Sequence, residues 1–214
     1  MLADNIAKIL LEKTAVKINP SNPFTWTSGI RSPIYCDNRI LVSFVEAREK
    51  IIQGFLQVIR EQQLEFDVVA GVATGAIAWG MLVADRLKKP FCYIRPEPRK
   101  HGTAKQIEGF VMKKSRILII EDLFSTAGSS IKAINTARTE LKAEVVGIVA
   151  ISTYELEEAR VRLKEAQVKW WTLTNFSTIV NQLEISDQEK NSILEFARNP
   201  AQWWSSRKKL NRYQ

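Results

Sequence analysis

The residues Arg116–Ser130, RILIIEDLFSTAGSS, constrain the fold of this chain more than any other stretch. The run Ile117–Ile120 is apolar and rich in β-branched residues, which is typical of a strand buried on both faces of a parallel sheet. Two acids, Glu121 and Asp122, end this run, and small or hydroxyl-bearing residues follow until an apolar helical period begins at Ile131. The pattern predicts a strand, a tight turn and the start of a helix.

The predicted turn has the chemistry of an anion-binding site. Free N–H groups and the helix dipole favour negative charge at a helix N-terminus. Ser125, Thr126 and Ser129 add hydroxyl donors, and Gly128 lets a phosphate approach closely. The Gly-Lys-Ser/Thr of the nucleotide P-loop is absent. Because two acids precede the turn, a ligand with hydroxyls beside its phosphate, such as a ribose phosphate, fits; the alternative is an ordinary capped helix beside unrelated acids.

The composition predicts one globular domain with a substantial core. The chain has 214 residues, of which 45% are hydrophobic and 25% charged. No apolar run is long enough to cross a bilayer, and the start, MLADNIAKILLEK, lacks the features of a signal peptide. Cys36 and Cys92 are too few for a disulfide framework or a zinc site. We therefore expect a cytoplasmic protein with no membrane partner.

The net charge of +8 is compatible with a nucleic acid, a membrane surface or anionic small molecules. Basic residues are densest between Arg95 and Lys105 and between Arg207 and Arg212. The terminal run is expected to be a solvated tail. Zinc-finger spacing, a ribonucleoprotein motif and basic-zipper heptads are all absent from the sequence, so no nucleic-acid partner is predicted.

Two motifs resemble a known family. The stretch Glu121–Ser130 resembles the phosphoribosyl-diphosphate motif of the type I phosphoribosyltransferases, with Ala127 where many members have glycine. The segment PFTWTSGIRSPIYCDNR, residues 23–39, is similar to the N-terminal hood of orotate phosphoribosyltransferases, which covers the base. The resemblance runs from Ala15 to about Pro200. It implies transfer of ribose 5-phosphate from 5-phosphoribosyl 1-diphosphate to orotate, giving orotidine 5′-monophosphate and pyrophosphate in de novo pyrimidine biosynthesis.

The chain in order predicts an α/β fold with a mainly parallel twisted sheet flanked by helices and a small N-terminal hood. Residues 1–214 are expected to form one phosphoribosyltransferase domain with a hood at about 15–40 and a mobile lid at about 96–108. Strands are expected at 66–70, 91–95, 117–120, 145–152 and 170–173. Helices are expected at 2–13, from a Ser43–Glu46 capping box to about 62, through 81–87, from Ile131 onward, at about 155–165, and from a capping box at Ser186 to a stop at Pro200.

The lid is the polar stretch RPEPRKHGTAKQIEG, residues 95–109. A loop of this length is usually functional or disordered, and a solvated basic loop can also be a cationic lid over a polyanion. It resembles the family's catalytic loop, with Arg99 where lysine is usual. Because arginine does not release its proton near neutral pH, Lys100 or His101 would have to supply one. In this family the lid serves the neighbouring subunit, which implies a homodimer.

A second strand-to-helix turn, Gly71–Ala76, predicts a second anion site, for which the family offers pyrophosphate. Glycines in such turns are common, so the pattern alone is weak evidence for an anion site. Some members carry a lysine at the position of Gly75; here the backbone and Thr74 would bind instead. The resemblance also implies a non-proline cis peptide between Ala73 and Thr74.

The resemblance implies three sets of site residues. The catalytic set is Arg99, Lys100, His101 and Asp122. The set for 5-phosphoribosyl diphosphate is Arg95, Arg99, Lys100, His101, Thr74, Glu121, Asp122, Leu123, Phe124, Ser125, Thr126, Ala127, Gly128 and Ser129. The orotate set is Ser125, Thr27 and Tyr35, with Thr27 where some relatives have a lysine that contacts orotate. The cofactor is magnesium, held mainly by substrate and water rather than by a protein metal site.

Two alternatives stay open. A regulator that senses phosphoribosyl diphosphate and binds nucleic acid has this fold, but such proteins carry an extra nucleic-acid-binding element. The chain keeps the acids and the lid's His-Gly and shows no such element. A phosphoribosyltransferase for another base is the closer alternative.

Overall fold

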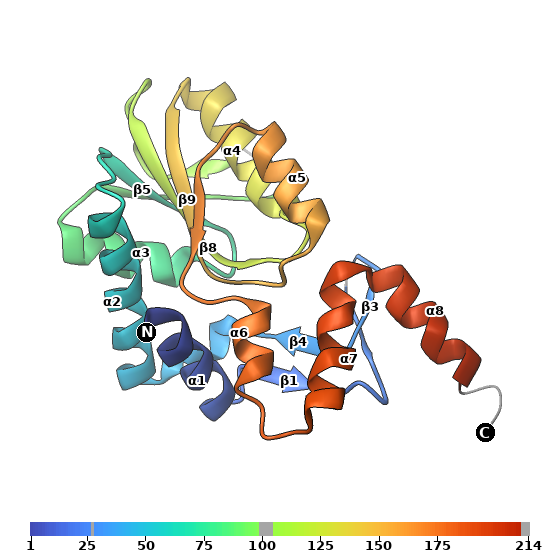
Figure 1. The fold of residues 1–214 in the computed structure, drawn as a ribbon. Coiled ribbons are helices and arrows are strands. Elements are labelled where there is room, and N and C mark those ends of the chain that lie inside the picture. The colour runs from blue at the N-terminus through green and yellow to red at the C-terminus, as the bar shows by residue number, and fades with distance from the viewer. Residues whose placement is uncertain (27, 99–104, 211–214) are drawn as a thin grey trace.

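The computed structural model describes residues 1–26, 28–98 and 105–210, except for the side chains of residues 207–210. Its centre is a six-stranded sheet in the order β10-β9-β8-β5-β6-β7 (Figure 1). The strands are β5 (Val68–Val72), β6 (Phe91–Ile94), β7 (Ile107–Glu108), β8 (Arg116–Phe124), β9 (Glu144–Thr153) and β10 (Trp170–Thr172). All neighbouring pairs are parallel except β6 with β7, so the predicted mainly parallel sheet is confirmed.

The strand order reverses between β5 and β8. The chain leaves β5 through α3 (Ile77–Leu87) for β6 on one side, and continues from β8 through α4 (Gly128–Leu141) to β9 on the other. The two strand-to-helix turns that were predicted to bind anions therefore lie side by side at this reversal. Ligands of open parallel sheets bind outside the carboxyl ends of the strands at such a point.

Helices cover both faces of the sheet, α2 (Val45–Glu61) and α3 on one side, and α4 and α5 (Glu157–Glu165) on the other (Figure 1). Because side chains alternate along a strand, β8 supplies Leu118 and Ile120 to the core under α2 and α3. Its residues Ile117 and Ile119 enter the second core, under α4 and α5. This explains the uninterrupted apolar run in the sequence.

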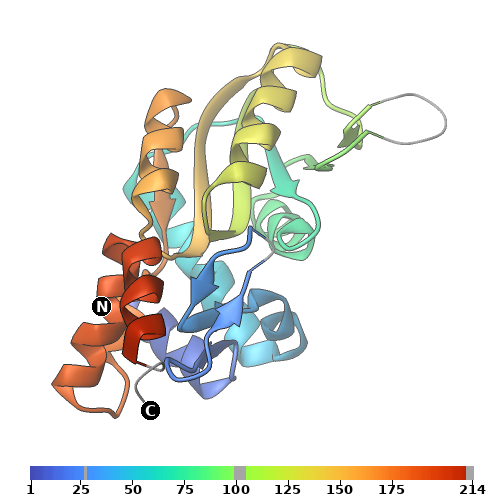
Figure 2. The same cartoon turned by 90° about the vertical axis from the view of Figure 1, so that its right-hand side faces the viewer.

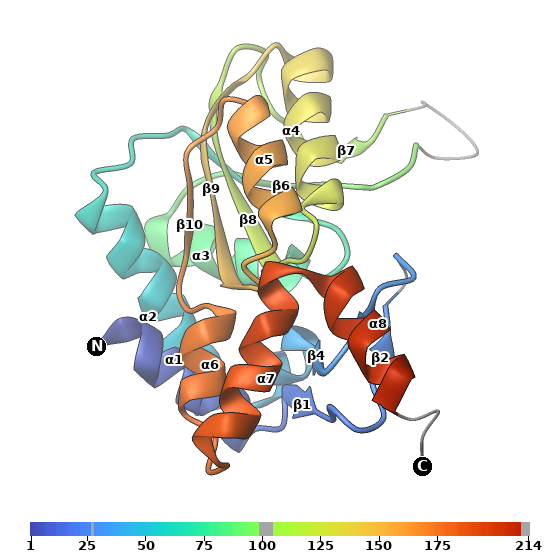
Figure 3. The ribbon, with the colours of Figure 1, turned by 45° about the vertical axis from the view of Figure 1, so that its right-hand side comes forward.

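The hood lies at the carboxyl ends of β8 and β9 (Figures 1 and 3). It contains the antiparallel pairs β1 (Val16–Ile18) with β4 (Ile34–Cys36), and β2 (Phe24–Thr25) with β3 (Arg31–Ser32), followed by the 3-10 helix η1 (Asn38–Ser43). Four helices adjoin it, as Figure 2 also shows: α1 (Leu2–Glu12), α6 (Phe176–Asn181), α7 (Asp187–Arg198) and α8 (Pro200–Leu210). Within the described ranges no helix is long and apolar enough to cross a membrane.

Several boundaries differ from the predictions. Strand β8 does not end before the acids but continues through them to Phe124, because it stays paired with β9 as far as Thr153. The Ser43–Glu46 capping box is wrong, since Ser43 ends η1 and the N-cap of α2 is Phe44. The capping box at Ser186 is confirmed.

Elements α6, β7 and α8 are among those that were not predicted. The short helix α6 and the two-residue strand β7 are too short to show a period, and β7 falls inside the predicted lid. Pro200 ends α7 as expected, but it also begins α8, because proline is well tolerated at the first position of a helix. In α8, Trp203 is buried in the domain, with its ring edge-on to Phe196 and its indole donating to the Ser192 oxygen at 2.7 Å.

Candidate active site

Glu121 is a buried carboxylate on the α4 side of the sheet, only 3% exposed. It has the same strand parity as Ile117 and Ile119, so its side chain points toward the first turn of α4. The hydroxyls of Ser129 and Ser130 donate to its Oε2 at 3.2 and 2.9 Å, and the N–H of Asp122 donates to its Oε1 at 3.0 Å. The acid and the predicted phosphate turn are thus one hydrogen-bonded unit.

Asp122 follows on the opposite face of the strand, toward α3. There it lies against Gly75, whose missing side chain leaves room for it: a Cβ on Gly75 would overlap the carboxylate and lie 2.5 Å from Cγ. The preceding peptide, Ala73–Thr74, is cis, as the resemblance implied, and Thr74 is exposed at the turn. The second turn therefore lies against the acid-bearing end of β8 at the reversal of strand order.

The environment favours the neutral form of both acids. Burial, followed by the charge of Asp122, raises the pKa of Glu121 well above its usual value. Burial also raises the pKa of Asp122, although hydrogen bonds and the charge of Arg39 oppose the rise. Two carboxyl groups held together with little water favour a bound group that donates hydrogen bonds or carries positive charge. Ribose hydroxyls and a developing oxocarbenium ion both have this property.

The predicted phosphate turn has a defined backbone conformation that a neighbouring helix supports. Ala127 is the N-cap of α4 and has φ +58°, a left-handed conformation in which glycine is easier to place; this accounts for the glycine of many family members. A Cβ on Gly128 would make only ordinary contacts, the nearest with Arg162 Nη1 at 3.6 Å. That Arg162 atom, on α5, donates to the Thr126 oxygen at 3.0 Å and so supports the loop from behind.

Two residues of the predicted phosphoribosyl diphosphate set, Phe124 and Ala127, can offer only main-chain groups to a ligand. The Phe124 ring is fully buried, edge-on to Trp170 at 6.0 Å. Ala127 is 2% exposed. Ser125, Thr126 and Leu123 are half-buried, whereas Ser129 is exposed.

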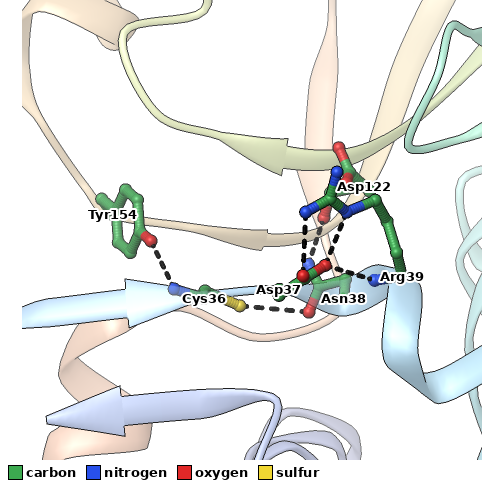
Figure 4. A network of polar contacts seen from close by, with 6 residues as sticks. All are labelled: Cys36, Asp37, Asn38, Arg39, Asp122 and Tyr154. Carbon is green, nitrogen blue, oxygen red and sulfur yellow. Dashed lines mark hydrogen bonds and ion pairs between the residues drawn. The ribbon is translucent and has the colours of Figure 1, made fainter. Parts of the chain in front are cut away.

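A buried polar network links the hood to the acids (Figure 4). Asn38, 1% exposed, donates from Nδ2 to the main-chain oxygen of Asp122 at 2.7 Å and to the Ser152 hydroxyl at 3.2 Å. Its Oδ1 accepts from the thiol of Cys36 at 3.1 Å. The hydroxyl of Tyr154, just after β9, accepts from the Cys36 N–H at 2.8 Å.

Aromatic stacking reinforces this link. The ring of Trp26 in the hood stacks on Tyr154 with centroids 4.3 Å apart, and its indole donates to the Ile34 oxygen at 3.1 Å. The hood is thereby fixed over the carboxyl ends of β8 and β9. Of the predicted orotate residues, Tyr35 is on β4, 37% exposed and packed near Phe24, while Thr27 lies outside the described residues.

The base of the predicted lid is a short hairpin. Arg95 follows β6, its N–H donates to the Gln106 oxygen at 2.9 Å, and its guanidinium pairs with Glu108 of β7 at 3.4 Å. Arg95 is thus engaged with the stem of the hairpin and does not contact the acids. Arg99, Lys100 and His101, the remaining cations of the catalytic set, lie outside the described residues.

The sequence did not single out Asn38, Tyr154 or Arg162. Asn38 carried a usable signal, since an asparagine followed by a basic residue closes the hood motif that was recognised. Tyr154 and Arg162 are separated from their partners by 118 and 36 residues, and no local pattern indicates such pairs.

Comparisons with known proteins identify the family of this chain. Residues 44–186 match the phosphoribosyl transferase domain family. Over 202 residues the chain is 43% identical to the orotate phosphoribosyltransferase of Lactococcus lactis subsp. cremoris, covering 92% of this chain and 96% of that protein. It is 44% identical over 206 residues to that of Streptococcus mutans, covering 94% and 98%.

The fold agrees as well. The crystal structure of orotate phosphoribosyltransferase from Aeropyrum pernix superposes with a TM-score of 0.73 at 28% identity, covering 83% of this chain and 97% of that one. With the paired strand-to-helix turns, the adjacent acids and the hood in place, the chain belongs to the orotate phosphoribosyltransferase family.

Proposed function

We propose that this protein catalyses magnesium-dependent transfer of ribose 5-phosphate from 5-phosphoribosyl diphosphate to orotate, in the cytoplasmic synthesis of pyrimidine nucleotides. One observation carries the proposal: Asn38 joins the hood, which would cover the base, to Asp122, which would hold the ribose. Such a link sets the distance between a bound base and the anomeric carbon that it attacks. Proximity of that kind contributes much of the rate of a two-substrate reaction.

The residues of the site have distinct roles in this proposal. N–H groups from Ser125 to Ser129 hold the 5-phosphate at the start of α4. Glu121 fixes the turn through Ser129 and Ser130 and, with Asp122, faces the ribose hydroxyls and the positive charge that grows as the anomeric C–O bond breaks. Thr74 and the backbone around it receive the diphosphate beside Asp122.

The donors around Asp122 fit magnesium held largely by substrate. Carboxylate oxygen is a ligand that this ion favours, and it usually keeps several waters or substrate phosphates. Across the described ranges, no three His, Cys, Asp or Glu side chains gather as a ligand cluster. Asp122 is therefore the protein group best placed to face the ion, and when bound the ion would neutralise charge on the departing diphosphate.

A homodimer with a shared lid completes the proposal. The cations Arg99, Lys100 and His101 would close over the diphosphate of the neighbouring subunit, neutralise it and exclude water. This arrangement rests on the resemblance of the loop. Arg95 would anchor the base of the lid through its pairing with Glu108.

The test is a spectrophotometric assay of orotate consumption with phosphoribosyl diphosphate. Orotate should be consumed and orotidine monophosphate formed only when magnesium is present, and the reaction should stop on chelation. Uracil, adenine and hypoxanthine serve as alternative acceptors. Faster reaction with one of these, or no reaction with any base, would overturn the proposal.

A further inference from the structure

Arg39 is a hood cation placed beside the acids and unassigned by the roles above. It follows Asn38, whose amide is fixed to Asp122, so the start of η1 brings the Arg39 side chain to the same edge of the site (Figure 4). The side chain is 60% exposed, yet it is held in a defined direction. An exposed arginine with a fixed head group is unusual, because the long side chain loses considerable entropy.

Asp37 holds the guanidinium of Arg39 in this direction. As the N-cap of η1 it accepts from the Arg39 N–H at 3.1 Å, from Nε at 2.7 Å and from Nη2 at 2.8 Å. The forked pairing fixes the plane of the guanidinium. In the part of the chain that the structure describes, the third nitrogen, Nη1, makes no hydrogen bond with protein, so it is available to a ligand.

The other hood cations have different neighbours, although the charge of Lys17 also acts on Asp37 and helps to lower its pKa. The hood, residues 15–40, contains only Lys17, Arg31 and Arg39 as basic residues. The guanidinium of Arg31 lies over the ring of Trp204 on α8, 5.5 Å from its centroid. Lys17 is opposite Tyr35 in the β1–β4 pair, on the outward-facing positions of the hood.

Orotate differs from uracil by a carboxylate, and a site that selects it needs a positive group near the base. Asp37 and Asp122 both place acidic groups at this edge, so the cation beside them determines whether a further acidic group is accepted. Thr27, in the hood segment expected to contact the base, is neutral. A guanidinium that bridges a protein carboxylate and a ligand carboxylate uses its donors on two sides.

We propose that Arg39, oriented by Asp37 and placed by Asn38, binds the carboxylate of orotate and determines the preference of the site for this base. The inference rests on the proposed function and deepens it. It assigns the base-selecting charge to the start of η1.

The experiment compares two product nucleotides that differ only in this carboxylate. Affinities for orotidine monophosphate and uridine monophosphate are measured by calorimetry for wild type, Arg39→Gln, Arg39→Lys and the matched hood control Arg31→Gln. Loss of one charged hydrogen bond predicts about a tenfold or greater loss of affinity for orotidine monophosphate in Arg39→Gln, and less than about a threefold change for uridine monophosphate. Arg39→Lys should recover part of the loss, and Arg31→Gln should change neither affinity.

Steady-state kinetics separates the remaining outcomes. Arg39→Gln should raise KM for orotate and leave KM for phosphoribosyl diphosphate unchanged, and Asp37→Asn should cause a smaller shift in the same direction. Equal weakening of both nucleotides, or a rise confined to KM for phosphoribosyl diphosphate, would overturn the inference. A wild type without orotate turnover contradicts the proposed function; an active wild type whose nucleotide preference survives Arg39→Gln contradicts this inference alone.

Discussion

The buried amide of Asn38 donates to the main-chain oxygen of Asp122 at 2.7 Å, joining two residues that are 84 positions apart in the sequence. The same amide reaches Ser152, and its oxygen accepts from Cys36. One side chain thereby connects β8, β9 and the hood. Because these groups are buried or partly buried, its loss leaves several of them without partners.

Asn38→Leu is expected to lower both stability and turnover. Unpaired buried groups predict a loss of about 1–3 kcal/mol in the free energy of unfolding, measured by urea titration. The matched control is Tyr154→Phe, which also removes a buried bond, between the hood and the residue that follows β9, but leaves the bond to Asp122 in place. If Asn38 positions the acid, kcat should fall more in Asn38→Leu than in Tyr154→Phe at comparable stability loss. Equal kcat in the two variants would show that Asn38 is only structural.

Asp122→Asn is expected to preserve the fold and to lower kcat by at least about tenfold, the equivalent of 1.4 kcal/mol of transition-state stabilisation. The amide has the same shape but cannot face positive charge on the ribose as a carboxylate does. Circular dichroism and the unfolding midpoint serve as controls for folding. A folded variant with wild-type kcat would remove Asp122 from the catalytic set.

Glu121→Gln is expected to reduce activity and to remove a pH-dependent contribution to the stability of the protein. Burial raises the pKa of Glu121 in the folded state, so the fold binds a proton that the unfolded chain has already released. Stability of the wild type therefore falls as pH rises above the unfolded value of 4.5, until the folded pKa is reached. Glutamine does not titrate, so the free energy of unfolding of the variant should rise relative to that of the wild type from pH 4 toward neutrality. A difference in unfolding free energy that is independent of pH would contradict the raised pKa of Glu121 in the folded state.

Gly75→Ala is expected to destabilise the protein because its methyl group meets the Asp122 carboxylate. Overpacking of this kind typically costs about 1–3 kcal/mol. The sharp test is a double-mutant cycle with Asp122→Ala, which removes the overlapping group. The stability loss caused by Gly75→Ala should be much smaller in the Asp122→Ala background. Additive stability losses would show that the new methyl group does not clash with Asp122.

Much of the active-site edge could be predicted from the sequence. The apolar run before Glu121, the small residues after it and the second turn at Gly71–Ala76 are local patterns, and each was found where expected. The period of two along β8 also decides which acid faces which helix. That step depends on the continuation of β8 through the acids to Phe124, which two polar residues after an apolar run do not indicate.

The remaining features depend on pairings that no local pattern encodes. Tyr154 meets Cys36 across 118 residues, and its hydroxyl carries no mark in the sequence that distinguishes it from an ordinary core tyrosine. The bidentate pair of Asp37 and Arg39 is local, but its direction toward Asp122 follows from the Asn38 contact alone. The contact between Gly75 and Asp122 arises only when β5 and β8 are neighbours.

The lid is expected to act across a dimer, and complementation tests this directly. A variant with Arg99 and Lys100 replaced by glutamine should be nearly inactive, because the diphosphate loses its neutralising charges. Asp122→Asn should be nearly inactive for a separate reason, the loss of the ribose-facing acid. If each site combines the acids of one chain with the lid of the other, a mixed dimer contains one site with both groups intact and one with both altered.

Mixing the two variants should therefore restore activity, up to about half the wild-type value per mixed dimer, since one of its two sites is intact. Differently tagged chains and a pull-down verify that subunits exchange, and each variant mixed with itself provides the baseline. Arg31→Gln mixed with Asp122→Asn controls for simple dilution, because its own sites are intact and the rate should follow their number. If exchange is verified and the mixture of the two inactive variants stays at the baseline, the lid serves the site of its own chain.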